Sequence, residues 1–200
     1  MAFKAFRIKQ VDGAIEAGFE QLEINDLSAG EVVVRVQYSG INYKDALAAT
    51  GKGRITRVPA LNGGIDLVGV VDSSTDERFH DGDAVLVCGA GLSETLDGGY
   101  SEFARVRGDA VVPLPPGLTA WEAGALGTAG FTAALAMMRM EDNHQEPALG
   151  PIVVTGATGG VGSFAIDMLA AKGFEVMAFT GKPEQHDYLR NLGASDFIDR

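Results

Sequence analysis

Cysteine, positive charge and long apolar runs are scarce in this sequence of 200 residues. The single cysteine, Cys88, cannot form an intrachain disulfide and cannot build a thiolate zinc site alone. The formal net charge is −11, so we do not expect a basic surface that binds nucleic acid. No apolar run approaches the roughly 20 residues of a membrane helix, and the first ten residues show no signal peptide. We therefore expect neither nucleic-acid nor membrane partners, and a cytoplasmic location.

The first half of the sequence contains short apolar or alternating runs bounded by Gly, Asp and Ser. The runs that predict strands are Ala2–Ile8, Glu31–Tyr38, Gly69–Asp72, Ala84–Cys88 and Tyr100–Val106. A turn is predicted at Asp81-Gly82-Asp83. Many short strands with Gly-rich connections indicate a partly closed, barrel-like β domain, which we expect to cover residues 1–117.

The pattern changes after residue 117. Thr119-x-x-Glu122 predicts a capping box, and the Ala- and Met-rich stretch Trp121–Met140 is predicted to be helical. The alternating elements predicted after it are strand Ile152–Thr155, helix Gly160–Lys172, strand Glu175–Thr180, helix Pro183–Leu192 and strand Asp196–Ile198. This order is the first half of a doubly wound parallel sheet, a Rossmann fold, over residues 118–200. Since the second βαβ half is missing, we expect the chain to be truncated.

A glycine-rich motif connects the first of these strands to its helix. Small residues are needed there because the backbone must turn sharply and approach a diphosphate closely, which the helix N-terminus then binds. The residues expected to contact a dinucleotide are Thr158, Gly159, Gly160, Val161, Gly162 and Ser163. Gly162 should also let helix and strand pack tightly. Ala157 stands where the G-x-G-x-x-G fingerprint has its first glycine, so a plain strand–helix turn remains the alternative.

The end of the second strand bears on the choice of cofactor. Proteins that bind NAD place Asp or Glu there to hold the ribose hydroxyls, whereas this sequence has Phe179-Thr180-Gly181-Lys182. Thr180 can donate to a 2′-phosphate and Lys182 can balance its charge, so NADPH is the expected cofactor. The alternative is that Thr180 only caps the next helix and Lys182 is solvated.

The glycine-rich motif also resembles that of short-chain dehydrogenases. Their catalytic pair is Tyr-x-x-x-Lys, and none of the four tyrosines in this sequence has Lys four residues later. The whole chain instead resembles the medium-chain dehydrogenase/reductase superfamily, whose members join a GroES-like β domain to a Rossmann domain. The segments that carry the resemblance are Gly40–Asp45, Gly64–Gly69, Gly82–Val85, Gly98–Phe103 and Gly159–Gly162.

Two positions distinguish this chain from the zinc alcohol dehydrogenases of that superfamily. Asn42 stands where they carry Cys, and Ile65 stands where they carry His. An amide and an aliphatic side chain cannot replace thiolate and imidazole as zinc ligands, so we expect no metal site. The resemblance is therefore to the quinone oxidoreductase branch, and most to its acrylyl-CoA reductase/quinone oxidoreductase group. The stretches typical of this group are Asn42–Leu47, Thr50–Gly53, Arg78–His80, Gly127–Ala133 and Val153–Ala157.

The resemblance implies an enzyme that transfers hydride from NADPH to the activated carbon–carbon double bond of an enoyl-CoA, without zinc. It places Tyr43 in the cleft, as a proton donor or a positioning group, although a tyrosine hydrogen-bonded in the domain joint is the alternative. Asn42 would orient substrate or be a turn residue. Thr128 would contact nicotinamide from a helix start or be a plain helix residue. Asp66 would belong to a structural salt bridge or to the catalytic site.

Three alternatives remain open for the function. The first is a quinone reductase. The second is a nucleotide-binding protein without turnover, and the third is an inactive fragment. A small-molecule substrate, enoyl-CoA or quinone, is the partner implied by the resemblance, which also leaves a homodimer open as the assembly.

Overall fold

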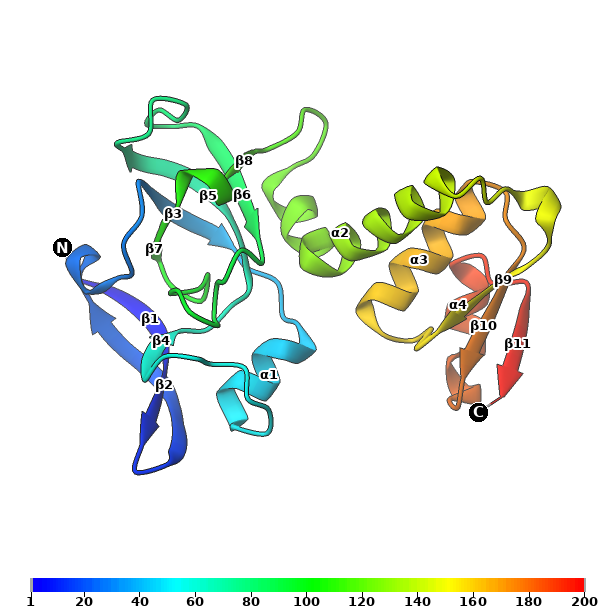
Figure 1. The fold of residues 1–200 in the computed structure, drawn as a ribbon, viewed down its shortest axis with the longest axis horizontal. Coiled ribbons are helices and arrows are strands. Elements are labelled where there is room, and N and C mark those ends of the chain that lie inside the picture. The colour runs from blue at the N-terminus through cyan, green and yellow to red at the C-terminus, as the bar shows by residue number, and fades with distance from the viewer. Residues whose placement is uncertain (1, 200) are drawn as a thin grey trace. The chain divides into compact units, whose positions relative to one another are not determined.

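The structure, a computed structural model, describes residues 2–199, which form two compact units. One unit extends to Thr128 and the other begins at Ala129. Figure 1 shows a β-rich first unit, in blue to green, and a second unit of helices and strands, in yellow to red. No helix within the described residues is long and apolar enough to cross a membrane.

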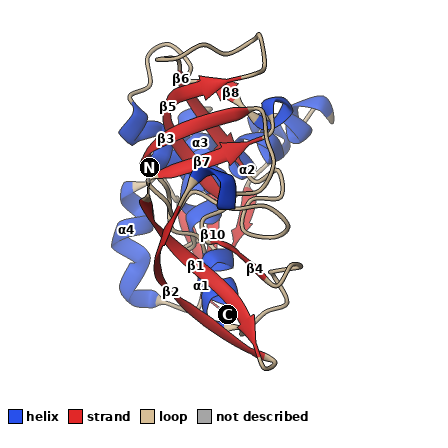
Figure 2. Ribbon diagram, turned by 90° about the vertical axis from the view of Figure 1, so that its left-hand side faces the viewer, coloured by secondary structure: helices blue, strands red, loops and turns tan. Residues whose placement is uncertain are grey.

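Antiparallel strands build most of the first unit. They are β1 (Phe3–Val11), β2 (Ala14–Leu22), β3 (Val32–Tyr38), β4 (Ala60–Asn62), β5 (Asp66–Ser74), β6 (Ala84–Cys88), β7 (Phe103–Val106) and β8 (Val112–Pro113). One sheet has the order β2-β1-β4 and the other has the order β7-β3-β5-β6-β8. Figure 2 shows β1 and β2 as a long twisted hairpin. The helix α1 (Tyr43–Thr50) and the 3-10 turns η1 (Ile24–Asp26) and η2 (Gly108–Ala110) complete the unit.

Side chains from the strands of the larger sheet form one hydrophobic core. Val32 and Val34 on β3, and Val85 and Val87 on β6, point inward because successive strand residues face opposite sides. A second cluster joins Ile8 on β1, Ala48 on α1 and Leu61 on β4. This cluster fixes α1 against the smaller sheet. It thereby positions the segment that precedes the helix.

The strands predicted in the first half are confirmed, and β6 has the predicted bounds. The predicted turn before β6 is also present, with Gly82 at φ +93°. The sequence pattern did not predict β2, β4, β8 or α1.

The second unit has the predicted alternation of strand and helix. Its elements are β9 (Ile152–Thr155), α3 (Gly160–Ala171), β10 (Val176–Thr180), α4 (His186–Asn191) and β11 (Asp196–Asp199), with short 3-10 turns η3 (Pro147–Leu149) and η4 (Pro183–Gln185). The sheet is parallel, in the order β11-β10-β9. Ile166 and Leu169 of α3, Leu189 of α4 and Val176 of β10 share one buried cluster. The helices therefore bury their apolar sides on the sheet.

The helix α2 (Ala120–Asp142) crosses the point at which the two units divide. It begins with the predicted capping box, in which Glu122 N–H donates to Thr119 Oγ1 at 3.2 Å and Thr119 N–H donates to Glu122 Oε2 at 2.8 Å. The hydrogen bonds from Thr119 hold the pKa of Glu122 below its usual value. The predicted helix is confirmed, but Gly127 breaks it, with φ 44° and ψ −151°.

Candidate functional site

The glycine-rich turn joins β9 to α3 and depends on glycine at two positions. Gly156 has φ +61°, a conformation that side chains disfavour. A Cβ on Gly162 would lie 2.4 Å from the carbonyl oxygen of Gly156, so the helix reaches the strand this closely only with glycine. The first turn of α3 has neither a side-chain cap nor an acidic residue. Because the first amides of a helix lack intrahelical acceptors, this turn presents N–H groups to an anion.

Residues 158–163, the six that were predicted to contact a dinucleotide, form this turn and the start of α3. Gly159, Gly160 and Val161 are exposed, whereas Thr158 and Ser163 are half-buried. The Ser163 hydroxyl donates to the carbonyl oxygen of Gly159 at 2.8 Å. Since that proton is already used within the helix, the backbone amides are the main donors that the turn offers.

Thr180 leaves the sheet at the same edge as this turn. In the parallel pairing of β9 and β10, Thr155 lies opposite Phe179, so Gly156 and Thr180 follow at the same end of neighbouring strands. Thr180 is buried, and its Oγ1 accepts a hydrogen bond from the backbone N–H of Lys182 at 3.2 Å. Thr180 thus holds the local turn, while Lys182 is exposed and can face a charged ligand.

Asp66 is the centre of a buried hydrogen-bond cluster in the first unit, at the start of β5. Its side chain is 3% exposed. Its Oδ1 accepts from the backbone N–H of Gly40 at 2.7 Å, and its Oδ2 accepts from Asn42 Nδ2 at 3.0 Å and from the backbone N–H of Thr128 at 3.2 Å. No ion pair to Asp66 occurs among residues 2–199, so the salt-bridge alternative is wrong. Neutral N–H donors compensate the cost of burying this carboxylate.

Asn42 and Tyr43 lie where α1 begins. Asn42 is the N-cap residue, and its backbone N–H donates to Asp45 Oδ2 at 2.9 Å. Its amide group is oriented by the bond to Asp66 described above. Tyr43 is the first residue of the helix and is 81% exposed. Asn42 is thus fixed by its neighbours, whereas the Tyr43 phenol is available to a ligand.

The break at Gly127 positions Thr128. A Cβ on Gly127 would lie 2.7 Å from Asp66 Oδ2, and the φ of Gly127 is positive, so this position requires glycine. Thr128 starts the helical segment that follows the break, and its backbone N–H reaches Asp66. The predicted residues Asn42 and Thr128, which are distant in sequence, therefore share one carboxylate.

The sequence interpretation missed Asp45 and Tyr100. Asp45 is 3% exposed, and its Oδ1 accepts from the backbone N–H of Ile65 at 3.0 Å. The hydroxyl of Tyr100 donates to the carbonyl oxygen of Gly40 at 3.0 Å. Burial, and then the nearby carboxylate of Asp45, raise the pKa of Tyr100 well above its usual value. The signal available in the sequence was Asn42-x-x-Asp45, which is a helix-capping spacing.

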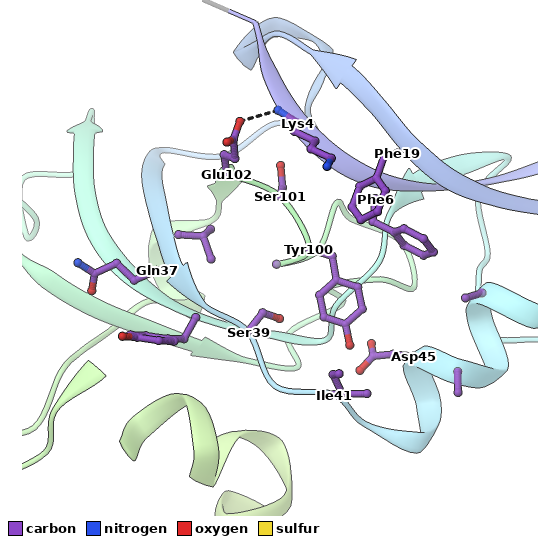
Figure 3. A pocket seen from close by; sticks show the side chains of 15 residues that line it. Lys4, Phe6, Phe19, Gln37, Ser39, Ile41, Asp45, Tyr100, Ser101 and Glu102 are labelled. Carbon is purple, nitrogen blue, oxygen red and sulfur yellow. Dashed lines mark hydrogen bonds between the residues drawn. The ribbon is translucent and has the colours of Figure 1, made fainter. Parts of the chain in front are cut away.

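A cavity of about 670 Å³ lies beside this segment, within the first unit. Figure 3 shows Tyr100 and Phe6 facing into it, with the Tyr100 hydroxyl directed toward Asp45. Ala46 and Ala49 of α1 line another wall. No sequence pattern indicated this cavity, because its walls come from β1, β2, β3, α1 and the loop before β7.

Metal-binding side chains do not gather at this site. Ile65 is buried and Asn42 donates to a carboxylate, so neither acts as a ligand in this arrangement. Within the part of the chain that the structure describes, no three His, Cys, Asp or Glu residues are placed to share a metal ion. Cys88 is a free cysteine and belongs to no such group, and burial raises the pKa of its thiol to about 11.

Comparison with known proteins places this architecture in a class. Residues 28–116 match the family model of the alcohol dehydrogenase GroES-like domain. The medium-chain dehydrogenases/reductases combine that domain with a parallel sheet of the Rossmann type, which follows it in the chain. The chain belongs to this superfamily, in its quinone oxidoreductase branch. The predicted fold and the predicted family are confirmed.

The similar proteins are longer than this chain. The acrylyl-CoA reductase AcuI of Ruegeria pomeroyi is 49% identical over 94% of this chain and 57% of its own length. The crystal structure of Escherichia coli YhdH with bound NADPH has a TM-score of 0.95 and 47% identity, over 98% of this chain and 61% of that one. Bacillus subtilis YhfP with NAD bound has a TM-score of 0.96 and 45% identity, over 100% and 60%. The chain thus spans about three fifths of these relatives.

Proposed function

We propose that the protein reduces the activated carbon–carbon double bond of an α,β-unsaturated thioester, such as acrylyl-CoA, with NADPH. The observation that carries this proposal is the glycine turn, in which the close approach at Gly162 leaves room for no side chain. The similarity to an acrylyl-CoA reductase and to an NADPH-bound structure supports it.

The residues of the second unit fit a dinucleotide. NADPH, when bound, supplies the hydride. The exposed amides at the start of α3 would hold the diphosphate, because they combine unsatisfied N–H groups with the positive end of the helix dipole. Lys182 would neutralise the 2′-phosphate at the neighbouring strand end. The family resemblance adds Thr128, at the helix start after Gly127, as a nicotinamide contact.

The residues of the first unit would serve the acceptor. Reduction of a conjugated carbonyl builds negative charge on its oxygen, which donors must stabilise, and a proton must reach the α-carbon. The exposed phenol of Tyr43 can donate that proton or a hydrogen bond. Asn42, held by Asp66, would orient the substrate. Asp66 itself acts through Asn42, so it is a positioning residue.

Quinone reduction is the second candidate, because the related protein of Bacillus subtilis is named a putative quinone oxidoreductase. One screen separates the candidates: oxidation of NADPH by the purified protein with acrylyl-CoA, crotonyl-CoA or benzoquinone. We expect the thioesters to react with the higher kcat/KM. Faster reaction of benzoquinone would favour the second candidate. Binding of NADPH in calorimetry without turnover of any acceptor would instead indicate a non-catalytic nucleotide-binding protein or an inactive fragment.

A further inference from the structure

A cluster of positive charge follows α1 in a chain whose formal net charge is −11. The cluster consists of Lys52, Arg54 and Arg57, whose side chains are all exposed. We call the segment that carries them, residues 51–57, the basic loop; it leads from α1 toward β4 (Figure 1). The chain has 27 acidic residues, but none of them lies in the stretch 46–65. The basic loop is therefore a local reversal of the overall charge.

The cations of the basic loop are not neutralised by the protein. Glu94 contacts the loop, because the backbone N–H of Arg57 donates to the Glu94 carbonyl oxygen at 2.7 Å, but the Glu94 carboxylate pairs with Lys44. Within residues 2–199, none of the three loop cations forms an ion pair or a side-chain hydrogen bond with another residue. Their donors are therefore available to an anion from solution.

Apolar contacts fix the backbone of the basic loop. Ile55 packs against the buried cluster that joins β1, α1 and β4. Gly51 ends α1 with φ 68°, and a Cβ there would lie 2.9 Å from Ile15 Cγ1 on β2. A Cβ on Gly53 would lie 3.3 Å from Leu47 Cβ. The exposed charges thus lie on a segment that is already held in place, so a ligand that binds them need not order it.

The basic loop lies at the opposite end of α1 from Tyr43, the proposed donor to the substrate. Tyr43 begins the helix and Gly51 caps it, and its eight residues rise by about 12 Å. The pantetheine arm of CoA has about as many backbone bonds as four amino-acid residues, so it extends to roughly 14 Å. A CoA thioester whose acyl group lies at Tyr43 can therefore reach the basic loop with its phosphate groups.

The cavity beside α1 is less suitable for phosphate groups. Two carboxylates, of Asp45 and Glu102, line it together with one cation, Lys4. The Nζ of Lys4 lies 4.2 Å from the centroid of the Phe19 ring, which already attracts it. Negative charge exceeds positive charge among the lining residues, so a polyanion is repelled there and attracted to the basic loop.

We propose that the basic loop binds the phosphate groups of CoA and so selects phosphorylated thioesters as substrates. The inference rests on the proposed function, because it assigns a site to the carrier of the proposed acyl group. The planar guanidinium groups of Arg54 and Arg57 can each donate two parallel hydrogen bonds to one phosphate, and Lys52 adds a point charge. These three residues touch no reacting atom, so they determine affinity and specificity without taking part in the chemical step.

Calorimetry with CoA, in the presence of saturating NADP⁺, tests this proposal without turnover. NADP⁺ is added because CoA also contains a phosphorylated adenosine and would otherwise compete for the nucleotide site. Arg54→Gln and Arg57→Gln should each weaken CoA binding about tenfold, the scale of one charge-assisted hydrogen bond. Arg35→Gln removes an exposed cation on β3, outside the basic loop, and should bind CoA like the unmodified protein.

Turnover supplies the second measurement. The KM for acrylyl-CoA should rise about tenfold in Arg54→Gln while kcat stays nearly unchanged, because a contact that is equal in the ground and transition states affects KM alone. Acrylyl-pantetheine has the same reacting group but no phosphate. Its kcat/KM should be the same in Arg54→Gln and in the unmodified protein.

Three results would overturn the proposal: no detectable CoA binding, equal CoA binding by all variants, or equal losses with acrylyl-CoA and acrylyl-pantetheine. A dependence on Arg54 that is seen only with acrylyl-loaded acyl carrier protein would also overturn it. Binding of CoA that requires the basic loop, without NADPH oxidation by any thioester, would refute the proposed function and leave the phosphate site intact. Acrylyl-CoA reduction with the same kcat/KM in all variants would do the reverse.

Discussion

Tyr43 is the residue whose exposure best suits direct contact with substrate. It is 81% exposed at the first position of α1, next to the fixed side chain of Asn42. We expect Tyr43→Phe to lower kcat by about a hundredfold, the lower end of the range for a lost proton donor, with little change in NADPH affinity. Steady-state kinetics and calorimetry measure the two quantities. Tyr188→Phe, at another exposed tyrosine, is the control, and equal loss of turnover and affinity would make Tyr43 a cofactor clamp.

Lys182 is the residue on which the choice between the two nicotinamide cofactors depends. It is exposed, two residues after the buried Thr180. Lys182→Ala should weaken NADPH binding about tenfold, the scale of one charge-assisted hydrogen bond, and should leave NADH binding nearly unchanged. Fluorescence titration with each cofactor checks this, with Lys172→Ala as the control. Parallel weakening of both cofactors would remove the argument from the 2′-phosphate.

Asp66 accepts hydrogen bonds from Gly40 and Asn42, which are close in sequence, and from Thr128, which is distant from both. Asp66→Asn turns one acceptor oxygen into an N–H₂ group that faces N–H donors, so we expect a loss of about 1–3 kcal/mol in the free energy of unfolding. Urea unfolding measures it. Asp72→Asn, on the exposed part of the same strand, should be nearly neutral. Equal free energies of unfolding for the two variants would mean that the hydrogen bonds to Asp66 do not stabilise the site.

The turn between β9 and α3 is the element in which a single methyl group decides the geometry. A Cβ at Gly162 meets the backbone oxygen of Gly156 at 2.4 Å, and backbone cannot move aside as a side chain does. Gly162→Ala should cost about 1–3 kcal/mol of stability and should abolish detectable NADPH binding. Thermal unfolding and calorimetry test both effects. Gly18→Ala, which has open space around its Cβ, should change neither; NADPH affinity retained in Gly162→Ala would argue against the proposed diphosphate site.

For whole helices and strands, the pattern of apolar residues decides which elements can be predicted from the sequence. The strand β6 and the helix α3 bury side chains at a clear period, and β3 and β9 begin with continuous runs of Val and Ile, so the sequence indicates all four elements. The strand β2 is mostly exposed and β4 has three residues, so neither has such a period. The helix α1 buries Asp45 and Ala48, and a buried carboxylate hides its amphipathic pattern.

The residues of the candidate site also divide into those that the sequence can predict and those that it cannot. The glycine turn is local, so its residues can be read from consecutive positions. The cluster around Asp66 needs the sheet pairing of β5, the cap of α1 and the break at Gly127, which only tertiary structure brings together. The resemblance predicted Asn42, Tyr43 and Thr128 as site residues. It did not indicate that Asn42 and Thr128 share one acceptor.

At the scale of the whole molecule, each unit has its own hydrophobic core. The cluster that contains Leu67 lies entirely in the first unit, and the cluster that contains Ile166 lies entirely in the second. Each side chain is fully buried, so truncation to Ala should remove about 2–5 kcal/mol from its own unit. Hydrogen exchange measured strand by strand reports where the loss occurs.

Leu67→Ala should speed amide exchange in β3 and β6 and leave β10 unchanged, whereas Ile166→Ala should do the reverse. NADPH at saturation should then slow exchange in β9 and β10 of Leu67→Ala, because a ligand stabilises the unit that binds it. Equal acceleration across both units in either variant would show that they unfold as one. In that case the second unit could not be treated as a separate nucleotide-binding body, and the effects expected for Gly162→Ala would extend to β3 and β6.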